Sequence, residues 1–323
     1  MRRTTGGVLL FLGAVLAVGP AFAGPHPGEG EGVSLRLRLR EGQVLRFRAH
    51  TVFHITMEEH PNLAGPEKAE TGIGLTCRFK VKAVDRETGT MTIGITYTRG
   101  EMNIKSGGQD IEYDSADVPA EVPPGAHWLA AGVGQTCEAD VTELGRVEEL
   151  RGIDELIEKA SKEIEAGPKR DAFVRRLKQQ FGSKAATNMI EQLLAVYPKR
   201  PVDVGDGWKN KVAVRHTLPM KLDRTFELKE RGDGVVRLEM KAEITPNPIP
   251  VPMGDDFEIK YKATGKQTGI FELDADTGWV RKVSRETRLS AEITPILPEG
   301  AHGNPDMPTL SIKGTETIEP VDD

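Results

Sequence analysis

Alternation of apolar and polar residues is the feature that most constrains the fold of this 323-residue chain. Leu35, Leu37 and Leu39 alternate with arginines, and the same period of two recurs in roughly a dozen segments separated by tight turns. Strands that are apolar on one face only and follow one another through short turns predict antiparallel pairing. The expected fold class is therefore mainly β (α+β), a large curved antiparallel sheet or open barrel-like structure with a short helical segment inserted mid-chain.

The period changes to 3.6 between residues 152 and 197. Apolar residues at this spacing predict three amphipathic helices, over residues 153–164, 173–181 and 186–197, each ended by Gly or Pro. The expected organisation is an N-terminal antiparallel β region (33–151), the helical segment (152–197) and a C-terminal antiparallel β region (198–323). Whether the two β regions form one continuous domain stays open at this point.

The first residues have the pattern of an export signal. Met1-Arg2-Arg3 precedes an uncharged, apolar stretch, and Ala21-Phe22-Ala23 matches a cleavage site. We expect a signal peptide over residues 1–23 and a disordered Gly/Pro-rich leader over residues 24–32; an uncleaved anchor is the alternative, although the apolar run is short for one. The predicted location is outside the cytoplasm, periplasmic or secreted. No later stretch is apolar enough to span a bilayer, so we do not expect the mature chain to cross a membrane.

Composition narrows the classes of partner. The formal net charge is −6, and Lys and Arg are scattered along the predicted strands instead of being clustered. Nucleic acid is therefore not an expected partner. A lipid-like ligand or an envelope protein remains as the expected class of partner.

Cys77 and Cys137 are the only two cysteines. An even number in an exported protein predicts a disulfide between them. Both fall on the apolar side of their predicted strands, so two buried free thiols are the alternative. Neither belongs to a C-x-x-C motif, which would indicate redox chemistry.

No motif for catalysis, a cofactor or a metal is evident. The chain has no G-x-S-x-G, H-E-x-x-H or phosphate-binding glycine loop. His50 and His54 lie about 13 Å apart on one predicted strand, too far to share an ion. Asp274–Gly278 and Arg231-Gly232-Asp233 are interpreted as hairpin turns. We therefore predict no catalytic, cofactor-binding or metal-binding residue, and the sequence favours a protein that is not an enzyme.

Several phrases resemble a known but uncharacterised family of exported, β-rich bacterial envelope proteins, a domain of unknown function. The resemblance implies export and a β-rich fold, and it implies no activity, cofactor or catalytic residue. Cys77 and Cys137 are not part of the family pattern. The phrases are Leu35–Gln43 with Phe47, Asp114-Ser115, Leu177–Gly182, Tyr197-Pro198 with Pro201–Trp208, and Asp276–Trp279.

The leading functional hypothesis is non-catalytic binding of an apolar ligand or envelope component. Five phenylalanines at inward positions are predicted to line an apolar cavity, and the alternative is that they only fill the core. A structural or protein-interaction module of the cell envelope is the second hypothesis, and an enzyme with an unrecognised site is the third. The predicted cavity residues are Phe47, Phe53, Phe79, Phe226 and Phe271.

Overall fold

The computed structural model describes most of the chain from residue 32 onward. The predicted signal peptide and residues 24–31 of the predicted leader lie outside the described residues. The described residues are 32–58, 68–117, 121–161, 167, 170–171, 174–175, 177–178, 182–214, 220–246, 251–253, 257–296 and 309–321.

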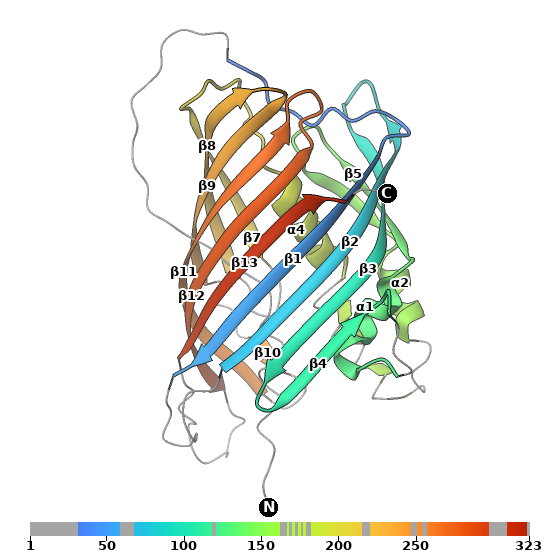
Figure 1. The fold of residues 1–323 in the computed structure, drawn as a ribbon, viewed down its shortest axis with the longest axis vertical. Coiled ribbons are helices and arrows are strands. Elements are labelled where there is room, and N and C mark those ends of the chain that lie inside the picture. The colour runs from blue at the N-terminus through green and yellow to red at the C-terminus, as the bar shows by residue number, and fades with distance from the viewer. Residues whose placement is uncertain are drawn as a thin grey trace, which may run out of the picture.

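The described strands form one antiparallel sheet of thirteen strands, which curves around a common interior (Figure 1). Its order is β6-β5-β3-β2-β1-β13-β12-β11-β9-β8-β7, with β4 beside β3 and β10 beside β11. Strand β1 pairs with β13, so the two predicted β regions join into one continuous sheet. The strands are β1 (Val44–Met57), β2 (Lys68–Val84), β3 (Met91–Ser106), β4 (Gln109–Asp114), β5 (Thr136–Val141), β6 (Val147–Arg151), β7 (Gly207–Val214), β8 (Met220–Gly232), β9 (Val235–Pro246), β10 (Val251–Met253), β11 (Phe257–Asp274), β12 (Val280–Ile296) and β13 (Leu310–Pro320).

The described helices are short, and two fall in the predicted helical segment. These are α2 (Ile153–Ser161) and α4 (Ser183–Leu194). Helix α1 (His127–Gly132), which follows a 3-10 turn η3 (Pro124–Ala126), was not predicted, because six residues are too few to show a helical period. The middle predicted helix (173–181) lies largely outside the described residues. None of the described helices has the length and apolar character needed to cross a membrane.

Helix α4 joins the two ends of the sheet. It contacts both β6 and β7, which are the edge strands of the sheet order. Arg146, just before β6, donates to the Glu191 carboxylate of α4 and to Asn210 Oδ1 of β7, both at 3.2 Å. An edge strand exposes unpaired backbone groups, and covering it with a helix is one way to protect it.

The predicted hairpin turns are confirmed. Asp274 Oδ1 accepts hydrogen bonds from the backbone N–H groups of Asp276 and Thr277, as expected for a side chain that caps its own turn. Asp233 and Gly234 connect β8 to β9 with φ of 51° and 73°. Two consecutive positive φ angles are typical of the tight turns that match the twist of a hairpin.

The N-terminal segment of residues 33–40 differs from the prediction. Its leucines are buried as the alternation predicts, but the segment is an extended chain outside the sheet and pairs only at Val33 with Val202. Its backbone bonds to two turns: Leu37 N–H donates to Glu143 O at 2.8 Å, and Arg38 N–H donates to Thr277 O at 2.7 Å. A period of two reports burial of one face and does not identify the hydrogen-bond partner.

A glycine allows this segment to approach the β11–β12 turn. Gly278 has a φ of 70°, and a Cβ there would lie 2.0 Å from Arg36 O. Gly278→Ala should lower the free energy of unfolding by about 3 kcal/mol or more, since backbone strain and a steric clash add together. Chemical denaturation measures this free energy.

Gly234→Ala is the matched control. It has a similar φ of 73° but no atom within 4 Å of the added Cβ. Its cost should be about 1–2 kcal/mol, from backbone strain alone. Equal losses in the two variants would contradict the close packing of the N-terminal segment on this turn.

Candidate functional site

The apolar side chains on the concave face form two main clusters. The upper cluster combines strand residues with residues of α2, α4 and the N-terminal segment, such as Ile157, Leu194 and Leu37. The described members of the lower cluster come only from strands, towards the ends of β1 and β11 that lie low in Figure 1. The buried members of the lower cluster are Phe53, Ile55, Ala69, Met220, Ile244, Ile259, Tyr261, Ala263, Leu289, Ala291, Ile293, Leu310 and Ile312.

A belt of polar side chains separates the two clusters. Cross-strand pairing places its members in two adjacent rows: Asn210 pairs with Arg224, Gln267 pairs with Thr287, and Arg285 pairs with Glu316. Five of the six are buried, and Glu316 is partly buried. Buried polar groups are rare on an otherwise apolar face, so this arrangement marks a candidate site. The polar belt consists of Asn210, Arg224, Gln267, Arg285, Thr287 and Glu316.

Arg224 holds the C-terminal end of α4. Its guanidinium donates to Gln192 O and Ala195 O, both at 3.1 Å, and Asn210 Nδ2 donates to the same Ala195 O at 2.5 Å. The last carbonyls of a helix have no partner within the helix and form the negative end of its dipole, which favours a cation there. Burial, together with repulsion from Arg285 and Arg146, lowers the pKa of the Arg224 guanidinium to about 9.

Three neighbours position the side chain of Arg285: a carboxylate that pairs with it, an aromatic ring beside it and a glycine that leaves space for it. Its guanidinium donates to Glu316 Oε1 at 2.7 Å and lies 5.9 Å from the centre of the Phe271 ring. Gly269 is its cross-strand neighbour on β11, and a Cβ there would lie 2.9 Å from Arg285 Cγ. The missing side chain at Gly269 thus leaves room for the arginine to lie across the concave face.

Three atoms of the belt have no hydrogen-bond partner in the described part of the chain. They are Arg224 Nε, Arg285 Nε and Gln267 Oε1. An unsatisfied buried donor or acceptor costs about 1–3 kcal/mol. The belt therefore keeps two N–H donors and one acceptor oxygen without a partner among the described residues.

The five predicted cavity residues do not lie together. Phe47 and Phe79 pack on Trp279 in the upper cluster, with ring centres 5.6 and 5.4 Å away. Phe226 and Phe271 contact each other there, 5.6 Å apart, just above the polar belt. Phe53 alone belongs to the lower cluster. Four of the five side chains thus fill the part of the interior that the helices cover.

The sequence patterns do not predict the belt residues, because those patterns consist of the apolar members of each alternating run. A signal was present in the sequence. Arg224 interrupts the inward series Leu222, Phe226, Leu228, and Arg285 and Thr287 interrupt the series on β12. A charged residue at an inward position is the pattern that could have identified them.

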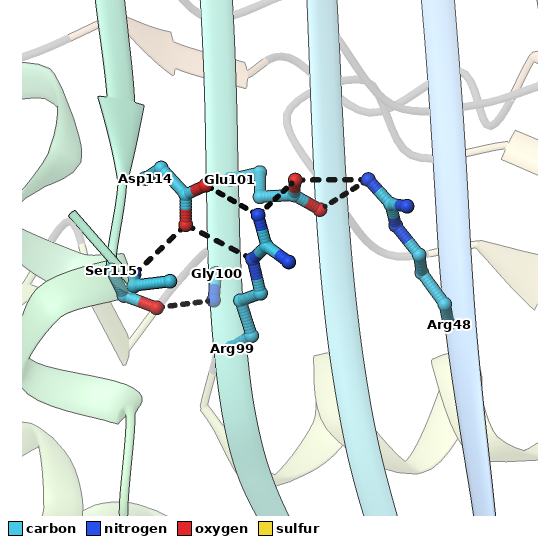
Figure 2. A network of polar contacts seen from close by, with 7 residues as sticks. Arg48, Arg99, Gly100, Glu101, Asp114 and Ser115 are labelled. Atoms are coloured by element: carbon cyan, nitrogen blue, oxygen red, sulfur yellow. Dashed lines mark hydrogen bonds and ion pairs between the residues drawn. The ribbon is translucent and has the colours of Figure 1, made fainter. Parts of the chain in front are cut away.

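A second polar network lies on the outer face of the sheet (Figure 2). Glu101 of β3 accepts from Arg48 of β1 at 2.7 Å, and Arg99 donates to Asp114 of β4. Glu101 reaches over β2 at Gly74, where a Cβ would lie 2.7 Å from its Oε2. Hydrogen bonds from Arg99 hold the pKa of the Asp114 carboxyl below its usual range. Both carboxylates are therefore held by arginines, and the network fastens strands together.

An open pocket of about 250 Å³ lies beside the seam that α4 closes. Its rim carries four basic side chains, and none of the five predicted phenylalanines lines it. It is lined by Leu144, Arg146, Tyr197, Pro198, Lys199, Arg200, Trp208, Lys209 and Asn210.

The predicted surface histidines lie on β1. His50 and His54 are exposed, and His54 Nδ1 lies 3.3 Å from Glu70 Oε2. Among the described residues, no three His, Cys, Asp or Glu side chains come together as ligands of a metal ion would.

Comparison with known families identifies the chain's relatives. The model of a family of unknown function, DUF6263, matches residues 88–280, which is more than half of the chain. The chain belongs to the DUF6263 family. This confirms the resemblance to an uncharacterised family, while export and an envelope location stay predictions. The DUF6263 match includes Arg224 and Gln267 of the belt and ends before Arg285. None of the curated proteins matches the chain.

Solved structures show only distant likenesses to this DUF6263 protein. A structure of lipovitellin and its lipid–protein interactions has 8% identity and a TM-score of 0.46, over 88% of this chain and 25% of the lipovitellin chain. A BenF-like porin from Pseudomonas fluorescens Pf-5 has 4% identity and a TM-score of 0.18, over 87% of this chain and 100% of the porin. This chain thus spans about a quarter of lipovitellin. Likenesses this weak carry no inference about function.

The predicted disulfide is not present in the structure, where Cys77 and Cys137 are both free thiols. Cys77 lies on β2 and Cys137 on β5, and β3 runs between them. Two strand spacings amount to about 9.5 Å, beyond the Cα separation of roughly 7 Å that a disulfide tolerates. Burial raises the pKa of the Cys77 thiol to about 12 and that of Cys137 to about 11.

Both thiols of the folded, unreduced protein should resist alkylation by iodoacetamide at pH 8, because the thiolate is the reactive form. Unfolding without reductant should expose both, and the mass should then rise by two alkyl groups. An unchanged mass after unfolding would show a disulfide instead.

The same thiols should make the fold sensitive to alkali. Their folded pKa values lie above the ordinary value of 9.0, so their stabilising contribution is complete below about pH 9 and is lost towards pH 11–12. A Cys77→Val/Cys137→Val variant should lose less stability than the wild type between pH 8 and 11 in urea titrations. Equal losses of unfolding free energy in the variant and the wild type would contradict the raised pKa values of the two thiols.

Proposed function

We propose that this DUF6263 protein is a non-catalytic binding protein whose concave face holds an apolar ligand of the acyl-chain type. One observation carries the proposal: helices and the N-terminal segment contribute to the upper cluster, whereas the described members of the lower cluster come only from strands. Among the described residues, an apolar ligand in this half of the interior would therefore lie against strand side chains alone.

The dimensions of the lower cluster fit such a ligand. Along β11 the lower cluster runs from Ala263 to Ile259, and the belt residue Gln267 lies four residues from Ala263. The whole distance from Gln267 to Ile259, eight residues, corresponds to about 27 Å in a strand. The hydrocarbon part of one bilayer leaflet is about 15 Å thick, half of the bilayer core. A full acyl chain can therefore lie along this face in contact with aliphatic side chains.

The ionisable groups favour binding over catalysis. Glu316 of the polar belt is bound to Arg285, and Glu101 and Asp114 of the outer network are bound to Arg48 and Arg99. A general base needs an accessible lone pair near the reacting group. We also propose an exported protein, periplasmic or secreted, on the strength of the sequence of residues 1–23.

A comparison of native and denatured mass spectra of residues 24–323, purified from an export-competent host, tests the proposal. We expect one lipid-like molecule bound per protein. This adduct should be lost on denaturation and recovered by organic extraction. Protein without the adduct should bind a fluorescent fatty acid, and the fluorescence emission should rise because the fluorophore is buried on binding. Absence of both the adduct and the titratable binding would contradict the proposal.

A substitution inside the lower cluster should block this binding. Ala263 is buried and faces Ala291, so Ala263→Leu adds volume where the ligand is proposed to lie. We expect at least tenfold weaker binding of the fluorescent fatty acid. Thr264→Leu is the matched control, because Thr264 is the next residue on β11 and is exposed. If both variants bind as the wild type does, the ligand does not lie on this face.

A further inference from the structure

We infer that the polar belt binds the end group of the ligand and that this group is a single anion, so that the protein selects monoanionic amphiphiles such as a long-chain carboxylate. The inference rests on the proposed function and adds the chemical class of the ligand. The belt is suited to this role because it borders the lower cluster: the next inward residue after Thr287 on β12 is Leu289, which belongs to that cluster.

The charges around the belt leave one cation without a carboxylate. Arg146 is paired with Glu191 at 3.2 Å, and Arg285 is paired with Glu316 at 2.7 Å. Arg224 donates only to the carbonyls of α4 in the described part of the chain. Among the described residues, these three cations therefore face two carboxylates, and the excess charge is on Arg224, whose side chain is almost fully buried.

A buried charge without a counter-ion is costly, because water no longer solvates it. The lowered pKa of Arg224 reflects both this desolvation and the repulsion from Arg285. An anion beside the two guanidinium groups would attract both and relieve their repulsion. The requirement is for one negative charge, since a dianion would leave an excess of the opposite sign.

The unsatisfied hydrogen-bonding atoms agree with this assignment. Arg224 Nε and Arg285 Nε each keep a free N–H, and anionic oxygens form the strongest hydrogen bonds with guanidinium groups. Gln267 Oε1 accepts no hydrogen bond from the described residues, so it could accept one from a hydroxyl group or water that accompanies the anion. Carboxylate and phosphate ester share this chemistry, and the experiment below separates them.

The test is a series of ligands with one chain length and different end groups: carboxylate, alkyl phosphate, alcohol and trimethylammonium. Displacement of the fluorescent fatty acid measures their affinities at pH 7.5. We expect the carboxylate to bind at least tenfold more tightly than the alcohol, and the trimethylammonium compound to bind most weakly. The alkyl phosphate should bind more weakly than the carboxylate, because most of it is doubly charged at pH 7.5.

The outcomes separate this inference from the proposed function. Equal affinities across the series would contradict anion binding by the polar belt, but they would remain consistent with binding of an apolar chain at the lower cluster. Loss of binding for all four ligands would overturn both. Tighter binding of the alkyl phosphate would overturn the assignment of a monoanion and point to a phosphate ester.

Two variants test the arginines. Arg224→Met should reduce the ratio of carboxylate to alcohol affinity to near one. Lys221→Met is its control, because Lys221 is an exposed residue of the same strand. Arg224 also caps α4, so Arg285→Met is made in parallel; it leaves that cap intact and should reduce the same ratio at least tenfold. An unchanged ratio in both variants would show that the arginines are structural only.

Discussion

Side chains of β7 and β8 cap the C-terminal end of α4, and the closure of the curved sheet depends on these hydrogen bonds. Arg224 and Asn210 donate to Ala195 O, and Trp208 Nε1 donates to Val196 O at 2.9 Å. Arg146, next to the first residue of β6, donates to Glu191 of α4. Because α4 contacts both edge strands, the cap holds the two ends of the sheet at one helix.

This closure divides the interior unequally. The helices and the N-terminal segment pack on the upper half of the concave face, where aromatic rings stack on one another. The described side chains of the lower half come from strands on several sides of the curve and are mostly aliphatic. The polar belt lies at the boundary, and its arginines stack on Phe226 and Phe271, the lowest rings of the upper half. An amphiphilic ligand suits such a boundary, because it offers a charged end and an apolar chain to adjacent surfaces.

Arg224 connects the closure of the fold with the proposed binding site. The same guanidinium that satisfies the helix carbonyls keeps an unpaired Nε and an uncompensated charge. Natural proteins tolerate such costs mainly at functional sites. Gly269 and Gly74 show a related principle on the two faces of the sheet, because each omits a side chain where a charged side chain from a neighbouring strand lies close.

The sequence by itself determined the class of the fold and most of its local structure. Alternating residues and turn signals predicted the antiparallel strands, and the 3.6-residue period located α2 and α4, because these patterns report which face of an element is buried. Tertiary structure alone decided the pairing of β1 with β13, the place of residues 33–40 outside the sheet, and the separation of the two cysteines by β3. It also assembled the polar belt from β7, β8, β11, β12 and β13. Local patterns contain no information on which distant strands become neighbours, since that choice depends on packing of the whole chain.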